Sequence, residues 1–193
     1  DRLRHIAELT ALGENKEALI SIMIPERPGS FRHLCHDLGP RLITEFNYRY
    51  SDNSDAYVFA GIQLKQGVEE KNRLIKNLKK KNYNVVDLSN DVAAKMHIRH
   101  MVGGHAPQAN DEVIYRFEFP ERSGALLHFL TEMGKRWNIS LFHYRNHGAA
   151  YGRVLMGFQI KENEKENFQQ FVDKLGILYW DESDNAAYKT FLR

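Results

Sequence analysis

The sequence of 193 residues has one cysteine, five prolines, no long apolar run and a net charge of only +2. A single cysteine, Cys35, excludes an internal disulfide and is compatible with a reducing compartment. The small net charge gives no argument for a nucleic-acid partner. No apolar run reaches the ~18 residues that a membrane-spanning helix requires, and no signal peptide is visible. These absences predict a cytoplasmic protein that binds neither nucleic acid nor a membrane.

Residue patterns suited to catalysis or metal binding are also scarce. The sequence contains no Walker loop, no dinucleotide fingerprint and no nucleophile elbow. His97, His100 and His105 cluster, but they lack the carboxylate or cysteine companions of a good metal site. Cys35 falls on the apolar side of an expected helix, which is typical of a packed thiol. We therefore expect no catalytic residue, no metal site and no cofactor in this chain.

What the sequence does contain is an internal repeat. Four blocks return in the same order at almost constant spacing: residues 25–29 as 120–124, 46–49 as 142–145, 61–64 as 157–160, and Asp87 with Lys95 as Asp181 with Lys189. The chain is therefore predicted to be a tandem pair of one small domain. A unit of this size is marginal alone, so we expect the two units to share an interface. Such a pseudo-symmetric junction is a natural place for a ligand.

Each unit is predicted to run strand, helix, strand, strand, helix, strand. In unit 1 these elements are expected at residues 18–24, 30–38, 43–50, 56–64, about 68–81 and about 84–88. The corresponding elements recognised in unit 2 are a helix ending at Gly134, strands at 139–146 and 151–160, a helix at about 164–175 and a strand at 177–180. Leucine and isoleucine at every third position predict a connector helix within residues 1–15. Unit 1 then spans residues 16–104 and unit 2 residues 105–193.

The order βαββαβ is the ferredoxin-like arrangement, an α+β fold in which both helices cover one face of an antiparallel sheet. The third strands, residues 56–64 and 151–160, are apolar on both faces. A sheet covered on one side only should instead alternate apolar and polar residues. We therefore expect the second face of the sheet to pack against another domain or subunit. The alternative is that its aromatic residues are simply exposed.

Two turns offer groups that can bind an anion. Residues 25–29 and their copy at 120–124 each place a glycine just before a helix N-terminus, where backbone N–H groups are unpaired. The helix dipole there is worth about 0.3–1 kcal/mol to a nearby anion. Glycine also lets a ligand approach the backbone closely. A carboxylate or a phosphate fits such a place, although the same sequence often forms a turn and nothing more.

The second strands supply another candidate pair. Asn47 and His143 share one face of their strands with Arg49 and Arg145, while the aromatic residues beside them point to the opposite face. The aromatic face is expected to be core. Two roles fit Asn47 and His143: contact with the polar end of a ligand, or a structural hydrogen bond. The two arginines are expected to form surface or interface ion pairs.

Tandem ferredoxin-like units with a Pro-Gly turn before the first helix resemble the ACT-type amino-acid-sensing domains. Longer motifs are similar to the C-terminal regulatory region of biosynthetic threonine deaminase (threonine ammonia-lyase). They are TEFNYR at residues 44–49, VDLS at 86–89, HMVGG at 100–104, NISLFHYR at 138–145 and YGRVL at 151–155. The resemblance runs from about Asp1 to the C-terminus.

The resemblance implies the activity of a larger protein. An N-terminal catalytic domain, which is not in this chain, would bind pyridoxal phosphate and convert threonine to 2-oxobutanoate and ammonia on the route to isoleucine. The regulatory region would bind isoleucine as inhibitor and valine as activator, within a tetramer. The alternatives are a structural or oligomerisation module that senses nothing, and a freestanding enzyme, which the lack of a recurring acid/base pair disfavours.

The candidate effector-binding residues are taken from both units. They are Gly29, Ser30, Phe31, Asn47, Gly124, Ala125, Leu126 and His143. The amide groups near Gly29 and Gly124 would hold the effector's carboxylate, and Asn47 or His143 would assist at its polar end. Unit 2 has Ser123 where unit 1 has Pro28, so the two sites are expected to be unequal, or only one of them to bind.

Overall fold

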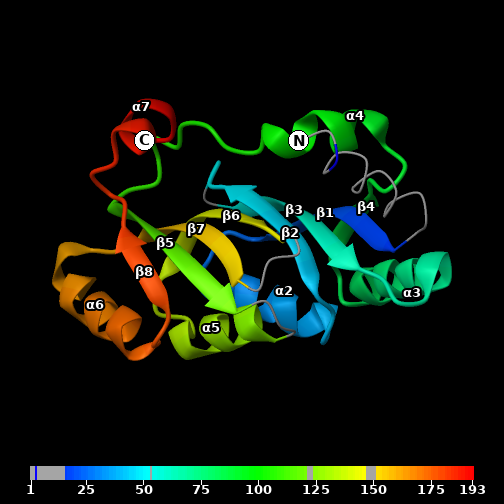
Figure 1. Ribbon diagram of the computed structural model, residues 1–193, viewed down its shortest axis with the longest axis horizontal. Helices are drawn as coiled ribbons and strands as arrows, with labels where there is room; N and C mark the ends of the chain where they lie inside the picture. Colours follow the sequence, from blue (N-terminus) through cyan, green and yellow to red (C-terminus); the bar gives the residue numbers. More distant parts are fainter. Residues whose placement is uncertain (1–2, 4–15, 53, 121–123, 147–150) are drawn as a thin grey trace.

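The strands of both units join in one antiparallel sheet of eight strands (Figure 1). The computed structural model describes residue 3 and residues 16–52, 54–120, 124–146 and 151–193. The expected connector helix at residues 1–15 lies outside the described residues except for Leu3. The predicted α+β fold of two βαββαβ units is confirmed, whereas the domain boundary at residues 104 and 105 stays a prediction.

The elements follow the predicted order in each unit. Unit 1 consists of β1 (Glu17–Pro25), α2 (Ser30–Leu38), β2 (Ile43–Arg49), β3 (Asp55–Gln63), α3 (Gly67–Lys80), β4 (Asn84–Asp87), α4 (Val92–Met96) and the 3-10 helix η1 (Ile98–His100). Unit 2 consists of β5 (Glu112–Pro120), α5 (Ala125–Met133), β6 (Asn138–Arg145), β7 (Tyr151–Gln159), the 3-10 helix η2 (Glu162–Glu164), α6 (Lys165–Lys174), β8 (Leu178–Asp181) and α7 (Ala186–Phe191).

Helices α2, α3, α5 and α6 form a layer on one face of the sheet (Figure 1). The first helix of each unit begins after a glycine in the left-handed conformation, Gly29 with φ 91° and Gly124 with φ 84°. A side chain at either position would be strained, which explains why the turn carries glycine in both copies. The apolar sides of the helices and the facing strand residues form one buried cluster that includes residues of both units. The two units therefore share a core.

The junction between the units is a pair of strands. The sheet order is β4-β1-β3-β2-β6-β7-β5-β8, so β2 of unit 1 lies antiparallel beside β6 of unit 2. In this pairing Asn47 faces His143, Phe46 faces Tyr144 and Tyr48 faces Phe142. Asn47 and His143 are repeat equivalents, so they mark the position of a pseudo-twofold axis. The predicted interface between units is thus a continuation of the backbone hydrogen-bonded sheet.

Short helices that the sequence analysis missed lie on the second face of the sheet, opposite the helix layer (Figure 1). In unit 1, Leu19 and Phe59 of that face form a buried cluster with Ala94 of α4. In unit 2, Ile114 and Leu141 form the equivalent cluster with Tyr188 of α7. The chain's own helices cover these residues, while Tyr57 and Tyr151 of the same face stay exposed, so packing of this face against another domain or subunit stays a prediction. Helices of five or six residues are too short to show a 3.6-residue periodicity.

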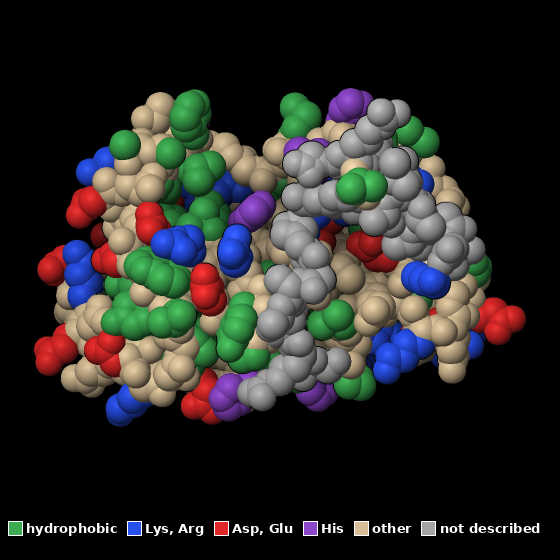
Figure 2. Space-filling model, viewed as in Figure 1, with side chains coloured by type: hydrophobic (Ala, Val, Ile, Leu, Met, Phe, Trp, Pro, Cys, Tyr) green, Lys and Arg blue, Asp and Glu red, His purple; other side chains and the backbone are tan. Residues whose placement is uncertain are grey.

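Some large apolar side chains remain at the surface. Tyr57 and Tyr151, at the ends of their strands, are 58% and 60% exposed. On the face shown in Figure 2, hydrophobic side chains gather over unit 2. The exposed apolar residues of unit 2 include Leu178 and Trp180 of the edge strand β8. The guanidinium of Arg116 lies 4.0 Å from the centre of the Trp180 ring. Among the residues described, no helix has the length and apolar character needed to cross a membrane.

Side-chain caps hold the two short helices of the second face. The carboxylate of Asp91 accepts a hydrogen bond from the Ala94 amide at 2.9 Å, and the side chain of Asn185 accepts one from the Tyr188 amide at 3.1 Å. The two caps occupy corresponding places in the two units. Each satisfies an N–H group that a helix start otherwise leaves unpaired.

We predict that Asp91→Ala lowers the free energy of unfolding by about 0.5–2 kcal/mol, because the first turn of α4 loses its cap. Urea denaturation of the variant and the parent chain measures this difference. Asp91→Asn is the matched control, since asparagine caps as well as aspartate. An equal loss in both variants would show that the cap is not the cause.

Candidate functional site

The pseudo-twofold axis places the two glycine turns at opposite ends of the α2–α5 pair. Because the two units are related by a twofold rotation, the N-terminus of each helix lies beside the C-terminal end of the other. Gly29 of α2 accordingly lies close to Lys135, which follows α5. Gly124 lies in the same cavity wall as Gly39, Pro40 and Arg41, which follow α2. The junction therefore offers two related positions, each built from both units.

The position at Gly124 is an apolar cavity of about 360 Å³, which we call the Gly124 pocket. Its lining residues are Cys35, His36, Gly39, Pro40, Arg41, Leu42 and Ile43 from unit 1, and Phe119, Pro120, Gly124, Ala125, Leu126, Leu127, Tyr144 and Val154 from unit 2. The volume lies in the range typical of small-molecule sites. The described wall is predominantly apolar, and the first turn of α5 lies at one side of it.

Cys35 and Arg41 of unit 1 are part of this wall, although sequence reasoning did not assign them to a site. Cys35 is 3% exposed, and burial raises the pKa of its thiol far above the usual value. It is therefore a neutral, apolar part of the wall. Arg41 donates a hydrogen bond to the Leu38 carbonyl at 2.8 Å, and its Nε lies 3.5 Å from a carboxylate oxygen of Glu70. Its guanidinium is thus already held by protein groups.

The position at Gly29 is different. A Cβ added at Gly29 would lie 2.9 Å from Cγ of Lys135, so the lysine stem covers this glycine. The turn borders a cleft of about 680 Å³ with both charged and apolar lining residues, which we call the Gly29 cleft. Its lining residues are Met23, Ile24, Pro25, Arg27, Pro28, Gly29, Ser30, His33, Asp55, Lys81, Asn82, Tyr83 and Lys135. Phe31 is not among them, because its side chain is buried against the sheet.

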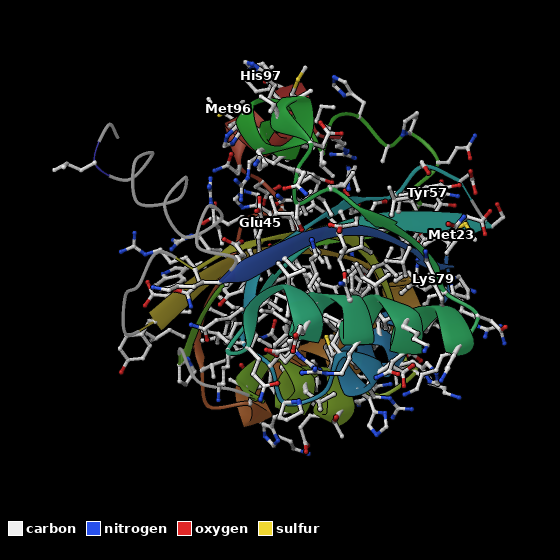
Figure 3. The ribbon with its side chains drawn as sticks, turned by 90° about the vertical axis from the view of Figure 1, so that its right-hand side faces the viewer. Met23, Glu45, Tyr57, Lys79, Met96 and His97 are labelled. Carbon is white, nitrogen blue, oxygen red and sulfur yellow. The ribbon has the colours of Figure 1, made fainter. Side chains whose placement is uncertain are left out.

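Asn47 and His143 lie on the other side of the sheet from both turns. The Asn47 amide donates hydrogen bonds to Glu45 at 2.7 Å and to the Arg99 carbonyl at 3.2 Å, and its Oδ1 is buried without a partner. In Figure 3, Glu45 lies between the sheet and α4, while α3 with Lys79 lies beneath the sheet. Asn47 and His143 therefore do not form one effector site with the glycine turns, contrary to the expectation. Successive strand residues point to opposite faces, so Asn47 cannot reach a ligand on the face of Phe46 and Tyr48.

The second face instead carries a buried polar network that joins the two units. Arg49 of β2 binds both carboxylate oxygens of Glu112 in unit 2, at 2.6 and 3.0 Å, and donates to the Gly104 carbonyl at 3.0 Å. Glu112 also accepts hydrogen bonds from Ser140 and, at 2.6 Å, from the Tyr188 hydroxyl. Burial and the neighbouring Glu112 raise the pKa of Tyr188. The expectation of an interface ion pair at Arg49 is thus met.

A second cross-unit contact lies in the Gly29 turn. One carboxylate oxygen of Glu26 accepts a hydrogen bond from the Asn138 amide of β6 at 3.1 Å, and the other is buried without a partner. Burial raises the pKa of Glu26 to about 7, which the Asn138 hydrogen bond opposes and the charge of Asp52 assists. An ionised Glu26 therefore destabilises the junction relative to its neutral form.

The described residues show no group of three or more histidine, cysteine, aspartate or glutamate side chains that could hold a metal ion. Of the eight predicted effector residues, Gly124, Ala125 and Leu126 come together in the Gly124 pocket. Gly29 and Ser30 lie in the Gly29 cleft, Phe31 in the core, and Asn47 and His143 on the second face. The unit 1 wall of the pocket, Gly39 to Ile43, was missed. Pairing the repeats about a twofold axis is the signal that could have found it.

Comparison with known proteins gives a consistent result. Residues 8–98 and 103–192 match the family described as the C-terminal regulatory domain of threonine dehydratase. The chain is 48% identical over 191 residues to the L-threonine dehydratase biosynthetic IlvA of Pasteurella multocida, covering 98% of this chain and 37% of the relative. It is 47% identical over 190 residues to the Escherichia coli protein of the same name, with the same coverage. The mitochondrial threonine dehydratase of Saccharomyces cerevisiae is 39% identical over 201 residues, covering 100% of this chain and 35% of the relative. The chain thus spans little more than a third of the length of these relatives.

We predict that the Glu26 carboxyl makes the stability of the chain depend on pH. Its folded pKa is raised from 4.5 to about 7, so its stabilising contribution is complete below pH 4.5 and is lost as the pH rises to 7. The difference in unfolding free energy between the parent chain and Glu26→Gln, measured by urea denaturation at several pH values, should change across this interval in that direction. Glu69→Gln, at an exposed site on α3, is the matched control for the removal of one carboxylate. A pH-independent difference for Glu26→Gln would contradict the prediction.

Proposed function

This chain belongs to the family of C-terminal regulatory domains of threonine dehydratase, and on that premise we propose that it senses branched-chain amino acids through the Gly124 pocket. The observation that carries the proposal is an apolar cavity walled by both units and open to a helix N-terminus. An amino acid such as isoleucine has a carboxylate and an apolar side chain. The pocket offers a partner for each.

The two ends of the effector would contact different parts of the pocket. The carboxylate lies at the first turn of α5, where unpaired amide groups and the helix dipole favour an anion. No atom of a described residue lies within 4 Å of the place where a Cβ on Gly124 would be, which supports approach of a ligand to the backbone there. The side chain then packs against the apolar wall formed by residues such as Leu42, Ile43 and Val154.

Opposite effects of isoleucine and valine follow from their influence on the junction. The two differ by one methylene, which is worth only about 0.8 kcal/mol on burial. A difference of this size cannot by itself turn inhibition into activation. Each effector must instead bind two states of the protein with different affinity. A pocket whose walls belong to both units is sensitive to their relative position, so the larger side chain and the smaller one favour different arrangements.

The remainder of the enzyme lies outside this chain. We propose that the larger protein converts threonine to 2-oxobutanoate and ammonia, and that pyridoxal phosphate is held by the part of the relatives that this chain does not cover. We further propose a tetrameric assembly and, because the two bacterial relatives are the more similar ones, a cytoplasmic location. The yeast relative is named as mitochondrial, which makes location a property to test separately.

We predict that isoleucine and valine each bind the chain and raise its melting temperature. At a ligand concentration of 100 times the dissociation constant, the stabilisation is about 2.7 kcal/mol. Isothermal calorimetry and a thermal-shift titration measure both effects, and alanine is the control because it buries less apolar surface. A folded chain that shows neither binding nor a rise in melting temperature with isoleucine and with valine would refute the proposal. Self-association without any ligand response would support a purely structural module instead.

A further inference from the structure

The pseudo-twofold axis would permit two equivalent effector pockets, yet the two positions are built differently. We propose that each chain binds one effector molecule, in the Gly124 pocket, and that the side chain of Phe31 occupies the corresponding place at the Gly29 turn. This inference rests on the proposed function for the identity of the ligand. Its structural basis is the comparison of residues that the repeat makes equivalent.

The first difference lies at Phe31 and its equivalent Leu126. Phe31 is 5% exposed, and its ring lies 5.2 Å from that of Tyr48 and 5.3 Å from that of Phe142. The aromatic side chain thus fills the space between α2 and the strands at the junction. Leu126 is only half-buried and lines the Gly124 pocket. The smaller residue therefore leaves open a volume that the larger one closes.

The second difference concerns access to the glycine. Lys135 lies over Gly29, whereas its equivalent in unit 1 is Pro40, which lines the Gly124 pocket; none of the described residues covers Gly124. A ligand that must come close to the backbone can therefore do so at Gly124. At Gly29 the lysine stem would first have to move.

The third difference is the polarity of the wall contributed by the other unit. At the Gly124 pocket this wall contains Leu42 and Ile43. The strand register makes Leu42 equivalent to Asn138, because Ile43 and Ile139 pair with corresponding residues of β3 and β7. Asn138 is hydrogen-bonded to Glu26 across the junction. A polar bridge thus stands where the pocket has an apolar surface.

The Gly29 cleft does not replace the missing pocket for an apolar amino acid. Its lining includes the charged side chains of Arg27, Asp55, Lys81 and Lys135. Burying an aliphatic side chain against these groups would remove their hydration without supplying hydrogen bonds, which is unfavourable. An effector with an aliphatic side chain therefore favours the Gly124 pocket.

Binding of an effector in the Gly124 pocket, and not at the Gly29 turn, has a consequence for regulation. The effector would contact the C-terminal end of α2 and the N-terminal end of α5, and leave the opposite ends of the two helices in their packed arrangement around Phe31. Binding therefore acts on one end of the helix pair, with the filled position as a fixed contact between the units.

Calorimetric titration of the complete 193-residue chain with isoleucine tests the proposal. The expected stoichiometry is one isoleucine per chain. Leu126→Phe, which copies the residue of unit 1, should weaken binding by at least about tenfold, because an added ring overpacks the pocket. Phe31→Leu is the matched exchange and should retain binding at the Gly124 pocket. Thermal unfolding checks that both variants are folded.

A second measurement does not depend on the variants. In methyl NMR spectra of the parent chain, isoleucine should shift the signals of Leu126, Leu127 and Val154, and leave that of Val58, the equivalent of Val154, unchanged. Two isoleucine molecules per chain, or binding lost in Phe31→Leu and kept in Leu126→Phe, would overturn the single-site inference while leaving the proposed function intact. Absence of binding to the parent chain would instead refute the proposed function itself.

Discussion

The antiparallel pairing of β2 with β6 is the interaction on which the rest of the structure depends. It joins the two units by backbone hydrogen bonds, and it aligns Asn47 with its repeat equivalent His143 at the centre of the sheet. The twofold relation that follows brings the N-terminus of each first helix beside the C-terminal end of the other. Without this pairing, the apolar walls contributed by the two units would not face each other, and neither unit alone could form the Gly124 pocket.

The sheet separates two kinds of contact between the units. On the helix face, the contact contains the Gly124 pocket at one end and the hydrogen bond between Asn138 and Glu26 at the other. On the second face, Arg49 binds Glu112, and Glu112 also holds Ser140 and Tyr188. Removing one partner of such a buried pair leaves an uncompensated charge and costs about 3–5 kcal/mol, so this face resists rearrangement. The two faces of the same strands therefore join the units by different kinds of contact.

The duplication preserved the fold and changed the residues at the junction. Both copies keep the glycine in the left-handed conformation before the first helix and a capped short helix on the second face. They differ where the units meet, with Phe31 against Leu126 and Lys135 against Pro40. The backbone requirements are local and identical in the two units, whereas the packing around the axis is shared. The position at the Gly29 turn can therefore be filled by Phe31, while the Gly124 pocket stays open, without loss of the fold.

The sequence by itself determined the two βαββαβ units, the aromatic core face of β2 and β6, and the glycine turn before the first helix of each unit, because hydrophobic periodicity and the repeat are local signals. It also indicated that the second face is covered, but it did not find α4 and α7, which cover part of that face and are too short for a periodic pattern. It grouped Asn47 and His143 with the glycine turns, although the pleat of the strands directs them to the opposite face. Only the tertiary structure decided which strands join the units, that Gly39 to Ile43 complete the pocket, and that Phe31 is buried. These outcomes depend on contacts between residues far apart in the chain, which no local pattern records.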